Sequence, residues 1–412
     1  MQKNIAVIGG GAAGMMAAIT AADNGACVTV YERNDRVGKK ILATGNGKCN
    51  FANRKLSPEA YFGGNSKLIA HVLEQFDDKA TVSFFENAGM LIKDKNGYLY
   101  PASEQASTVL DILRIQLVNK GVTVRCEQKV SKIWRDKDTD KIVITAGKTD
   151  ALYDSVVIAC GGSAAPKTGS DGTGCYLAGN LGHTIKEVVP ALVQLRCKEG
   201  FLKDIAGVRA EAKVSLMIDG ECRAEERGEL QLTDYGVSGI VVFQVSRIAA
   251  YALKEKKEVA VYIDFLPDFS EEELLGFANK RMEKAWQKQT VEEFFAGMLN
   301  KKLMLLFIRL AGLKPEQSIK DADNKKLHKV FSLCKQFALV VLTTNSFDNA
   351  QVSAGGVSLE EVTENLESKL HKGVYFAGEI LDVDGKCGGY NLQWAWSSGY
   401  VAGYSAAKKE FI

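Results

Sequence analysis

The stretch that decides the fold is Ile5-Ala6-Val7-Ile8-Gly9-Gly10-Gly11-Ala12-Ala13-Gly14, near the start of the 412-residue chain. Its first four residues are an apolar run, which predicts a short buried strand. We expect a helix over residues 15–24, a second strand over Cys27–Tyr31, and an acidic residue, Glu32, at the end of that strand. A GxGxxG turn alone is weak evidence, but strand, turn, helix, strand and acid in this order predict a Rossmann-type dinucleotide site.

Each part of this unit has a physical role in binding a diphosphate. Gly9 makes the tight turn, Gly11 lets the backbone approach the diphosphate, and Gly14 lets the helix pack close to the strand. Ala12 and Ala13 lie where free N–H groups at the helix start attract an anion. Glu32 is expected to accept a hydrogen bond from a ribose 2′-hydroxyl, and its charge would repel a 2′-phosphate.

The segment that follows favours FAD as the dinucleotide. Lys39 and Lys40 are placed to neutralise the diphosphate, beside a turn at 45–47 in a stretch poor in apolar residues. Two lysines alone are typical of a solvated turn, which stays the alternative. The turn at Gly45 beside these lysines favours contact with the cofactor over a solvated turn.

The far end of the chain carries a second group of signals. A strand is expected over 373–377, followed by Gly378 and Glu379, and a helix over 392–408. The start of that helix would stabilise negative charge on the flavin N1–C2=O edge, and Glu379 would hold a ribityl hydroxyl. Gly399, Ala402 and Gly403 make one face of the helix small, so another group can lie close to it. An ordinary C-terminal packing helix is the alternative.

The middle of the first half supplies one more expected strand, Ser155–Ile158, which runs into Ala159, Gly161 and a loop over 163–174. Before it, residues 122–126, 129–135 and 141–146 predict a strand meander. Because cofactor signals lie before residue 175 and after residue 353, we expect an α/β fold with a Rossmann-like FAD-binding domain built from both chain ends, residues 1–189 and 346–412.

Residues 190–345 carry no nucleotide signature and are expected to form an insert. Strands over 213–218, 222–233 and 259–265, with a hairpin turn at Asp219-Gly220, predict an inserted β-subdomain over 190–268 and 338–345. Capping boxes at 270–273 and 290–293 and apolar periodicity over 301–310 and 325–337 predict a helical subdomain over 269–337. Since ligand sites favour domain interfaces, we expect a ligand over the flavin to meet residues of the insert on its outer side. Phe243, Leu266 and Phe269 are candidate apolar lining, with a place in the core of the insert as the alternative.

Composition excludes several classes of function. Lys and Arg number 52 against 50 Asp and Glu, so the net charge of +2 gives no footprint for nucleic acid. The basic residues of 279–303 alternate with glutamates, which favours a solvated helical face over an RNA surface. No apolar run is long enough for a membrane span, and we expect no leader before the first strand. Nine cysteines without a CxxC pair fit a reducing cytoplasm, and four histidines without a ligand motif argue against a metal site.

The chain resembles the BaiN-like FAD-dependent oxidoreductases, a family whose members include a 3-dehydro-bile acid reductase and an aminoacetone oxidase. The resemblance runs almost end to end and is most specific in residues 38–50 and 376–399. Lys39 and Lys48 stand where the family often has Arg, Asp234 where many members have His, and Ile240 where Pro is common. The change at Asp234 puts in doubt any catalytic role carried over to that position.

The resemblance implies bound FAD and a set of contact residues. Among these contacts, the resemblance implies one from the main chain of Val130 to the adenine of FAD. The positions implied around the adenosine, diphosphate, ribityl chain and ring are Ala13, Gly14, Glu32, Arg33, Lys40, Gly45, Asn50, Gly378, Glu379, Asp382, Asn391 and Leu392.

The same family leaves two enzyme functions open. The first is hydride transfer between flavin N5 and the β-carbon of an enone, such as a 3-oxo bile acid or steroid-like intermediate, and it is the one that we favour. The second is oxidation of an amine such as aminoacetone by O₂. A flavin-binding sensor or RNA-associated protein is the non-enzyme alternative. Asp234 and Tyr235 are weak candidates for contact with the substrate, with strand-end polar residues in solvent as the alternative.

The electron donor is less determined than the cofactor. No second GxGxxG occurs, so NAD(P)H would bind transiently rather than in a domain of its own. Dithiol chemistry is disfavoured because Cys49 stands alone where such enzymes place two cysteines, and Cys387 is more typical of a structural thiol. The sequence does not determine the oligomeric state.

Overall fold

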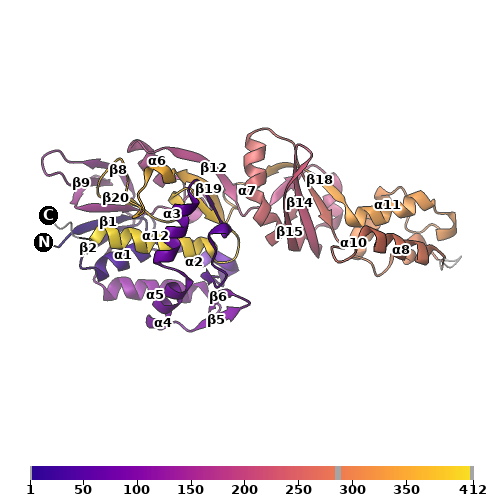
Figure 1. Ribbon diagram of the computed structural model, residues 1–412, viewed down its shortest axis with the longest axis horizontal. Coiled ribbons are helices and arrows are strands. Elements are labelled where there is room, and N and C mark those ends of the chain that lie inside the picture. Colours follow the sequence, from indigo (N-terminus) through magenta and orange to yellow (C-terminus); the bar gives the residue numbers. More distant parts are fainter. Residues whose placement is uncertain (1, 284–288, 409–412) are drawn as a thin grey trace. The chain divides into compact units, whose positions relative to one another are not determined.

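The computed structural model describes residues 2–283 and 289–408, and the chain divides into two compact units. Unit 1 comprises Met1–Pro190 and Phe347–Ile412, and unit 2 comprises Ala191–Ser346. Each unit has a hydrophobic cluster of its own. The described residues nearest to the two ends of the chain belong to unit 1 and lie side by side (Figure 1), where Lys3 Nζ donates to the Ala406 carbonyl at 3.2 Å.

Unit 1 is built on a five-stranded sheet in the order β20-β11-β1-β2-β7. Its pairings are all parallel: Ile5 of β1 pairs with Ser155 of β11 on one side and with Val28 of β2 on the other. The apolar runs of β1 and β11 are buried, as expected of strands covered on both faces. The strands are β1 (Asn4–Ile8), β2 (Cys27–Tyr31), β7 (Thr123–Arg125), β11 (Ser155–Ile158) and β20 (Val374–Phe376).

Helices α1 (Ala12–Asp23) and α12 (Tyr390–Ala407), which come from opposite ends of the chain, pack against each other. A Cβ on Gly399 would lie 2.5 Å from the Ala13 carbonyl oxygen, and one on Gly403 would lie 2.3 Å from that of Ala17. The small face of α12 therefore receives α1, which confirms the expectation that another group lies close to it. Both helices also begin earlier than expected, directly after Gly11 and Gly389.

The prediction of a three-strand meander was wrong for its first strand, expected over residues 122–126. Residues 123–125 form β7, which is exposed and pairs with β2 at the edge of the parallel sheet. The meander consists instead of β8 (Val130–Arg135), β9 (Ile142–Ala146) and β10 (Thr149–Tyr153). Pairing of a short exposed strand is made by backbone groups, so its side chains do not indicate the partner.

The remaining helices and strands of unit 1 surround this framework. They are α2 (Lys39–Ala43), β3 (Ala52–Asn53), β4 (Tyr61–Gly63), α3 (Ser66–Gln75), α4 (Asp78–Asn87), β5 (Ile92–Lys95), β6 (Tyr98–Pro101), α5 (Ala106–Asn119), α6 (Thr173–Asn180), β12 (Ile185–Ala191), β19 (Val352–Val357) and β21 (Val383–Gly385). Across the described residues, no helix is both long and apolar enough to cross a membrane.

Unit 2 contains a closed barrel in the order β13-β16-β15-β14-β17-β18. The expected hairpin is present, with Asp219 and Gly220 at φ 50° and 82° between β14 and β15. Closure of the strands into a barrel leaves no open edge, and no motif in the sequence predicts it. The barrel strands are β13 (Leu195–Cys197), β14 (Arg209–Ile218), β15 (Glu221–Leu232), β16 (Gly236–Ser238), β17 (Val259–Asp264) and β18 (Phe337–Thr344).

The helices of unit 2 share one hydrophobic cluster with the barrel. The two expected capping boxes form at Ser270 and Thr290. The last helix ends at Lys335, and Phe337 already belongs to β18, so the expected helix over 325–337 was two residues too long. Part of the basic stretch 279–303 lies outside the described residues. The helices are α7 (Ile240–Lys254), α8 (Glu271–Glu283), α9 (Val291–Phe295), α10 (Lys301–Leu310) and α11 (Asn324–Lys335).

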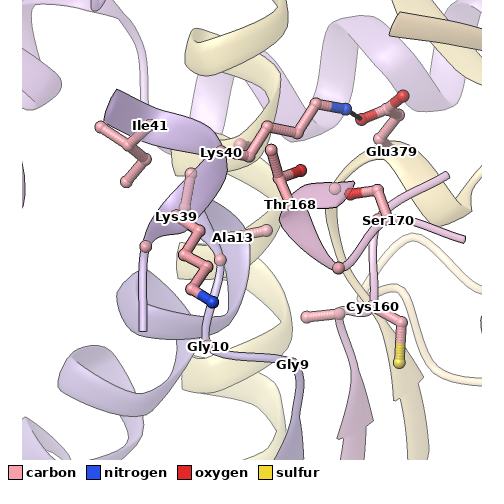
Figure 2. A pocket seen from close by; sticks show the side chains of 18 of the residues that line it. Gly9, Gly10, Ala13, Lys39, Lys40, Ile41, Cys160, Thr168, Ser170 and Glu379 are labelled. Atoms are coloured by element: carbon pink, nitrogen blue, oxygen red, sulfur yellow. Dashed lines mark hydrogen bonds and ion pairs between the residues drawn. The ribbon is translucent and has the colours of Figure 1, made fainter. Parts of the chain in front are cut away.

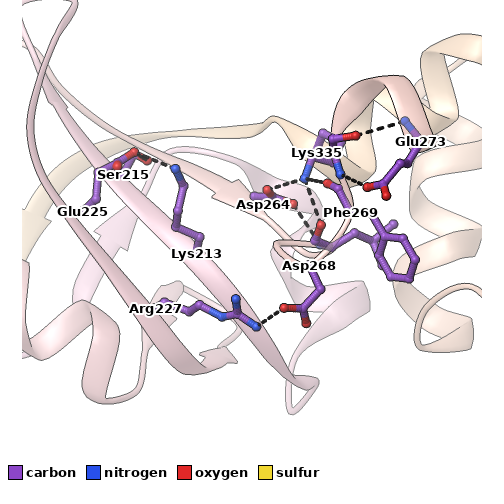
Figure 3. A network of polar contacts seen from close by, with 11 residues as sticks. Lys213, Ser215, Glu225, Arg227, Asp264, Asp268, Phe269, Glu273 and Lys335 are labelled. Carbon is purple, nitrogen blue, oxygen red and sulfur yellow. Dashed lines mark hydrogen bonds and ion pairs between the residues drawn. The ribbon is translucent and has the colours of Figure 1, made fainter. Parts of the chain in front are cut away.

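A buried ammonium group joins the end of α11 to the end of β17 and the loop before α8 (Figure 3). Lys335 Nζ donates to Asp264 Oδ2 at 2.6 Å, to the Leu266 carbonyl at 2.8 Å and to the Phe269 carbonyl at 2.6 Å. The side chains of Lys335 and Asp264 are only 12% and 14% exposed. All three ammonium hydrogens therefore have acceptors, which offsets the cost of burying the charge.

We predict that Lys335→Met lowers the free energy of unfolding by about 3–5 kcal/mol, because it leaves Asp264 charged and unpaired in a buried place. Urea unfolding measures this loss. Lys329→Met on the exposed part of the same helix is the control, and adding Asp264→Asn to Lys335→Met should restore part of the stability. A loss no larger than that of the control would contradict the role of this network.

A second buried polar group, His183, holds the loop after β19 in unit 1. Its Nδ1 lies 3.1 Å from Glu361 Oε2 and its Nε2 lies 2.8 Å from Ser368 Oγ. Ser368 Oγ already accepts from the N–H groups of Leu370 and His371, so its own hydrogen is directed to Nε2. The ring is thus neutral in the folded state, and burial lowers the pKa of His183 against the opposing effect of Glu361.

We predict that acidification below about pH 6.5 destabilises the protein through His183, because the unfolded chain binds the proton that the folded chain excludes. Above that pH, the contribution of His183 to the free energy of unfolding is fully present. Below it, this free energy falls by at most about 1.4 kcal/mol per pH unit. His183→Gln should flatten the dependence of the unfolding free energy on pH between 7 and 5, whereas His71→Gln should not. Equal slopes in all three proteins would refute the assignment.

Candidate functional site

A pocket in unit 1 lies at the carboxyl ends of the parallel strands. Residues that directly follow β1, β2, β11 and β20 all line it, which is the place where open parallel sheets bind ligands. The lining residues are 8–13, 31–34, 38–41, 44, 128–130, 159–161, 168–170, 173, 351–352, 377–379, 383, 391–392 and 394–395.

The glycine turn between β1 and α1 has the geometry that a dinucleotide site needs. Gly9 has φ 105°, and a Cβ there would lie 2.4 Å from the Ala159 carbonyl oxygen. A Cβ on Gly14 would lie 1.9 Å from the Gly9 carbonyl oxygen, so α1 packs directly on the turn. A Cβ on Gly11, in contrast, would meet nothing within 4 Å, so this backbone position opens onto free space.

The start of α1 presents unsatisfied N–H groups to the same pocket. Its N-cap is Gly11, which has no side chain to accept from them, and the first turn contains no acidic residue. Helix α12 begins in the same way after Gly389, and Asn391 and Leu392 of its first turn line the pocket. Two helix starts without caps or acids suit two negatively polarised groups, as a diphosphate and a flavin C2=O edge are.

Glu32 has room for one more hydrogen bond. Its Oε2 accepts from Gly10 N at 2.9 Å, and its Oε1 accepts from Asn34 N at 2.8 Å and Asn34 Nδ2 at 2.7 Å. The residue is only 7% exposed. A carboxylate accepts about four hydrogen bonds, so three protein donors orient Glu32 and leave one position for a hydroxyl.

Two charged residues of the pocket, Lys40 and Glu379, form an ion pair with each other (Figure 2). Lys40 Nζ lies 2.7 Å from Glu379 Oε2, and Glu379 Oε1 accepts from the N–H and hydroxyl of Ser353. Lys39 pairs with Asp35 at 2.7 Å. The Lys40–Glu379 pair joins residues from the two ends of the chain, and each lysine keeps further N–H groups for an anion.

A loop from the middle of unit 1 closes another side of the pocket. Arg33 forms an ion pair with Asp171, and Asn34 Nδ2 donates to the Thr168 carbonyl at 3.0 Å. Burial opposes ionisation of Asp171, but hydrogen bonds from Arg33 and Thr173 outweigh it and lower its pKa to about 2. The segment 168–170 is therefore held beside the residues that follow β2.

The structure gathers most of the expected cofactor residues around this pocket, and it leaves four outside the lining. Those in the lining are Gly9, Gly11, Ala12, Ala13, Glu32, Arg33, Lys39, Lys40, Val130, Ala159, Gly161, Gly378, Glu379, Asn391 and Leu392. Those outside it are Gly14, Gly45, Asn50 and Asp382. Asn50 is adjacent to the α12 start, and its Oδ1 is buried with no partner among the described residues.

Sequence analysis missed several lining residues. Thr168, Ser170, Gln351 and Trp394 have no motif that marks them, since they reach the pocket through the folding of loops and one helix. The loop over 163–174 was noticed as glycine-rich, and its position directly after a buried strand was the one signal available.

The cysteines near the pocket are protonated at neutral pH. Burial raises the pKa of Cys160, a lining residue, to about 12 and that of Cys49 to about 11. A thiolate is the reactive form, so neither residue is set up for dithiol exchange with a cofactor.

The two weak candidates for substrate contact belong to unit 2. Asp234 is exposed. Tyr235 is half-buried and lies against Arg196, with its hydroxyl accepting from Asn345 Nδ2 at 3.2 Å. Their roles stay predictions. Of the candidate apolar lining, Phe269 is 52% exposed, and Leu266 packs against the core of unit 2.

Comparison with known proteins identifies relatives over the full chain. The model of the HI0933-like protein Rossmann domain matches residues 3–405. The 3-dehydro-bile acid delta(4,6)-reductase of Clostridium scindens is 42% identical over 410 residues, which cover 99% of this chain and 100% of that protein. The ribosomal RNA dihydrouridine synthase of Haemophilus influenzae is 27% identical over 409 residues, 98% of each chain.

A solved structure agrees with the fold. The 3-ketosteroid-delta4-(5alpha)-dehydrogenase from Rhodococcus jostii RHA1, in complex with 4-androstene-3,17-dione, aligns over 99% of this chain and 97% of its own, with a TM-score of 0.51 and 17% identity. At that identity it supports the architecture alone. The family match and the full-length relatives lead to one conclusion: the chain belongs to the HI0933-like family and is an FAD-dependent oxidoreductase.

Proposed function

We propose that the protein reduces a C=C bond conjugated with a carbonyl group in a small 3-oxo bile acid or steroid-like molecule. The observation that carries the proposal is the 42% identity, over the whole of both chains, to a protein named as a 3-dehydro-bile acid reductase. The product of a dihydrouridine synthase is uridine reduced at C5=C6, a bond also conjugated with a carbonyl. Both named relatives therefore fit one reaction type, which supports this bond as the target.

FAD supplies the two-electron chemistry, since its reduced form can give a hydride to the β-carbon of such a bond while the α-carbon takes a proton. The protein's own groups bind and orient the cofactor. The free N–H groups at Gly11–Ala13 would hold the diphosphate, and Glu32 would accept from the ribose. The α12 start would stabilise charge on the ring, and Asn50 Oδ1 offers an unused acceptor beside it.

We propose NAD(P)H as the electron donor. It would bind transiently and not in a domain of its own, since the sequence has one GxGxxG only.

Two other substrates enter the test. Uridine in RNA is the second candidate, because two relatives are named ribosomal RNA dihydrouridine synthases. Aminoacetone with O₂ is the alternative that the family resemblance left open.

We predict that the chemically reduced holoprotein, kept free of oxygen, is reoxidised within seconds by a 3-oxo-4-ene steroid acid, because that substrate accepts the hydride at its β-carbon. The flavin absorbance near 450 nm measures this reoxidation, and mass spectrometry should find a product two mass units heavier. The saturated 3-oxo acid is the control and should leave the flavin reduced. Reoxidation by a uridine-containing RNA alone would replace the steroid with the second candidate, and turnover of aminoacetone alone would contradict both.

We predict that Glu32→Gln weakens FAD binding by about 10- to 100-fold, which corresponds to the loss of about 1.5–3 kcal/mol from charge-assisted hydrogen bonds. A glutamine amide has one acceptor oxygen instead of two. It therefore cannot accept hydrogen bonds from Gly10 N–H, from Asn34 and from a ribose hydroxyl as the carboxylate does. Titration of apoprotein with FAD, followed by flavin fluorescence, gives the dissociation constant. Glu127→Gln, at an exposed neighbouring position outside the pocket, is the control. Equal dissociation constants in the two variants would refute the role of Glu32.

A further inference from the structure

A second hollow in unit 1 adjoins the cofactor pocket. Its volume is about 460 Å³, which is within the range of small-molecule sites. Tyr31, the last residue of β2, and Gln128 line both this hollow and the cofactor pocket. The hollow also takes Arg125 from the end of β7, and Thr149 and Ala151 from β10. We call the hollow that these five residues line the arginine hollow.

Arg125 is held against an aromatic ring. Tyr31 and Arg125 are paired across β2 and β7, and the guanidinium carbon lies 5.7 Å from the centre of the Tyr31 ring. Arg125 Nη1 also donates to Tyr31 Oη in a long hydrogen bond of 3.5 Å. Tyr31 is itself fixed, since it is buried and its Oη lies 2.8 Å from Tyr153 Oη. The ring restricts the direction of the guanidinium while most of its five N–H groups stay free, so the cation is partly ordered before a ligand arrives.

Arg125 has no counter-charge in the part of the chain that the structure describes. Its side chain is exposed and makes no ion pair there. Burial above all raises the pKa of Tyr31 to about 12, so the phenol beside the guanidinium is neutral at physiological pH. An unpaired cation alone is common on a protein surface, but this one opens onto a hollow in which other polar groups are also free.

Those groups are the side chains of Gln128 and Thr149. Among the residues that the structure describes, neither the amide of Gln128 nor the hydroxyl of Thr149 makes a hydrogen bond with the protein. Each of them can donate to an oxygen atom of a ligand. The described lining includes no acidic residue, and the small side chain of Ala151 leaves space. The arginine hollow therefore offers one positive charge and several hydrogen-bond donors to the same volume.

We propose that the arginine hollow binds an oxyanion group, a carboxylate or a phosphate, of a small molecule other than FAD. A guanidinium and an oxyanion form paired, charge-assisted hydrogen bonds. The donors of Gln128 and Thr149 suit the remaining lone pairs of the oxyanion. The site lies within unit 1 and does not depend on which substrate the enzyme reduces.

The hollow is connected to the cofactor pocket through the backbone. Glu32 N donates to the Arg125 carbonyl at 2.9 Å, and Gln128 N donates to the Glu32 carbonyl at 2.9 Å. Two residues of the hollow are therefore bonded directly to the residue that we expect to accept from the ribose of FAD. Because the ligand would be a neighbour of FAD, the test uses protein saturated with FAD, in which the cofactor pocket is filled.

The probes are 4-fluorophenyl phosphate and 4-fluorobenzoate, which carry the two oxyanions, and 4-fluorobenzamide, which is neutral. Their dissociation constants with the FAD-saturated holoprotein are measured by fluorine NMR titration. We expect at least one acid to bind about 10-fold more tightly than the amide, because only the acids form charge-assisted hydrogen bonds with Arg125. The acid that binds more tightly identifies the oxyanion that the hollow takes.

Variants then assign the binding to the hollow. Arg125→Gln should weaken binding of the acid by about 10-fold and change that of the amide by less than about twofold. Lys132→Gln is the matched control and should change neither. Lys132 Nζ also lies 5.7 Å from the centre of an aromatic ring, that of Trp134, but outside the hollow. Thr149→Glu, at an exposed position, brings a carboxylate into the hollow and should abolish binding of the acid, whereas Thr149→Gln should retain it.

Three results would overturn the proposal. The first is absent binding of both acids by the wild type, or binding no tighter than that of the amide. The second is an unchanged affinity for the acid in Arg125→Gln. The third is binding of the acid to apoprotein that FAD abolishes, because the anion would then occupy the cofactor pocket. None of these measurements requires turnover, so a failure of enone reduction leaves the test unaffected.

Discussion

The contact between Gly14 and the carbonyl oxygen of Gly9 is the constraint on which unit 1 depends. With only 1.9 Å available for a Cβ, no side chain fits between helix α1 and the turn that precedes it. The helix start is thereby fixed at the end of β1, and its N–H groups face the edge where β2, β11 and β20 also end. Any displacement of α1 would remove these groups from that edge, and with them the main attraction for a diphosphate.

The same principle of close backbone approach joins the two ends of the chain. Gly399 and Gly403 let α12 lie on α1, with Ala13 and Ala17 as the contact points, so the α12 start is positioned relative to the α1 start. The Lys40–Glu379 pair adds a polar connection between the same two ends. Because unit 1 is completed only when both ends have met, the intervening chain is free to form a separate core.

Much of unit 1 could be predicted from the sequence because its signals are local. The run from Ile5 to Glu32 predicts a strand, a turn, a helix, a second strand and an acidic residue in that order. Each of these predictions depends only on residues that are neighbours in the chain. What could not be predicted depends on contacts between distant residues. The partner of β7, the closure of the barrel and the lining residues Thr168 and Gln351 are set by which backbones meet, and no periodicity encodes that choice.

The small face of α12 shows how a correct pattern can leave its partner unnamed. Gly399, Ala402 and Gly403 do indicate a close neighbour, but a cofactor and a helix backbone make the same demand on side-chain size. Specificity presents the opposite problem. A steroid enone and a uracil ring offer the same conjugated bond, so the groups that position a flavin have no means of distinguishing them. The distinction must come from residues that bind the remainder of the substrate, since selectivity is a difference between two binding free energies.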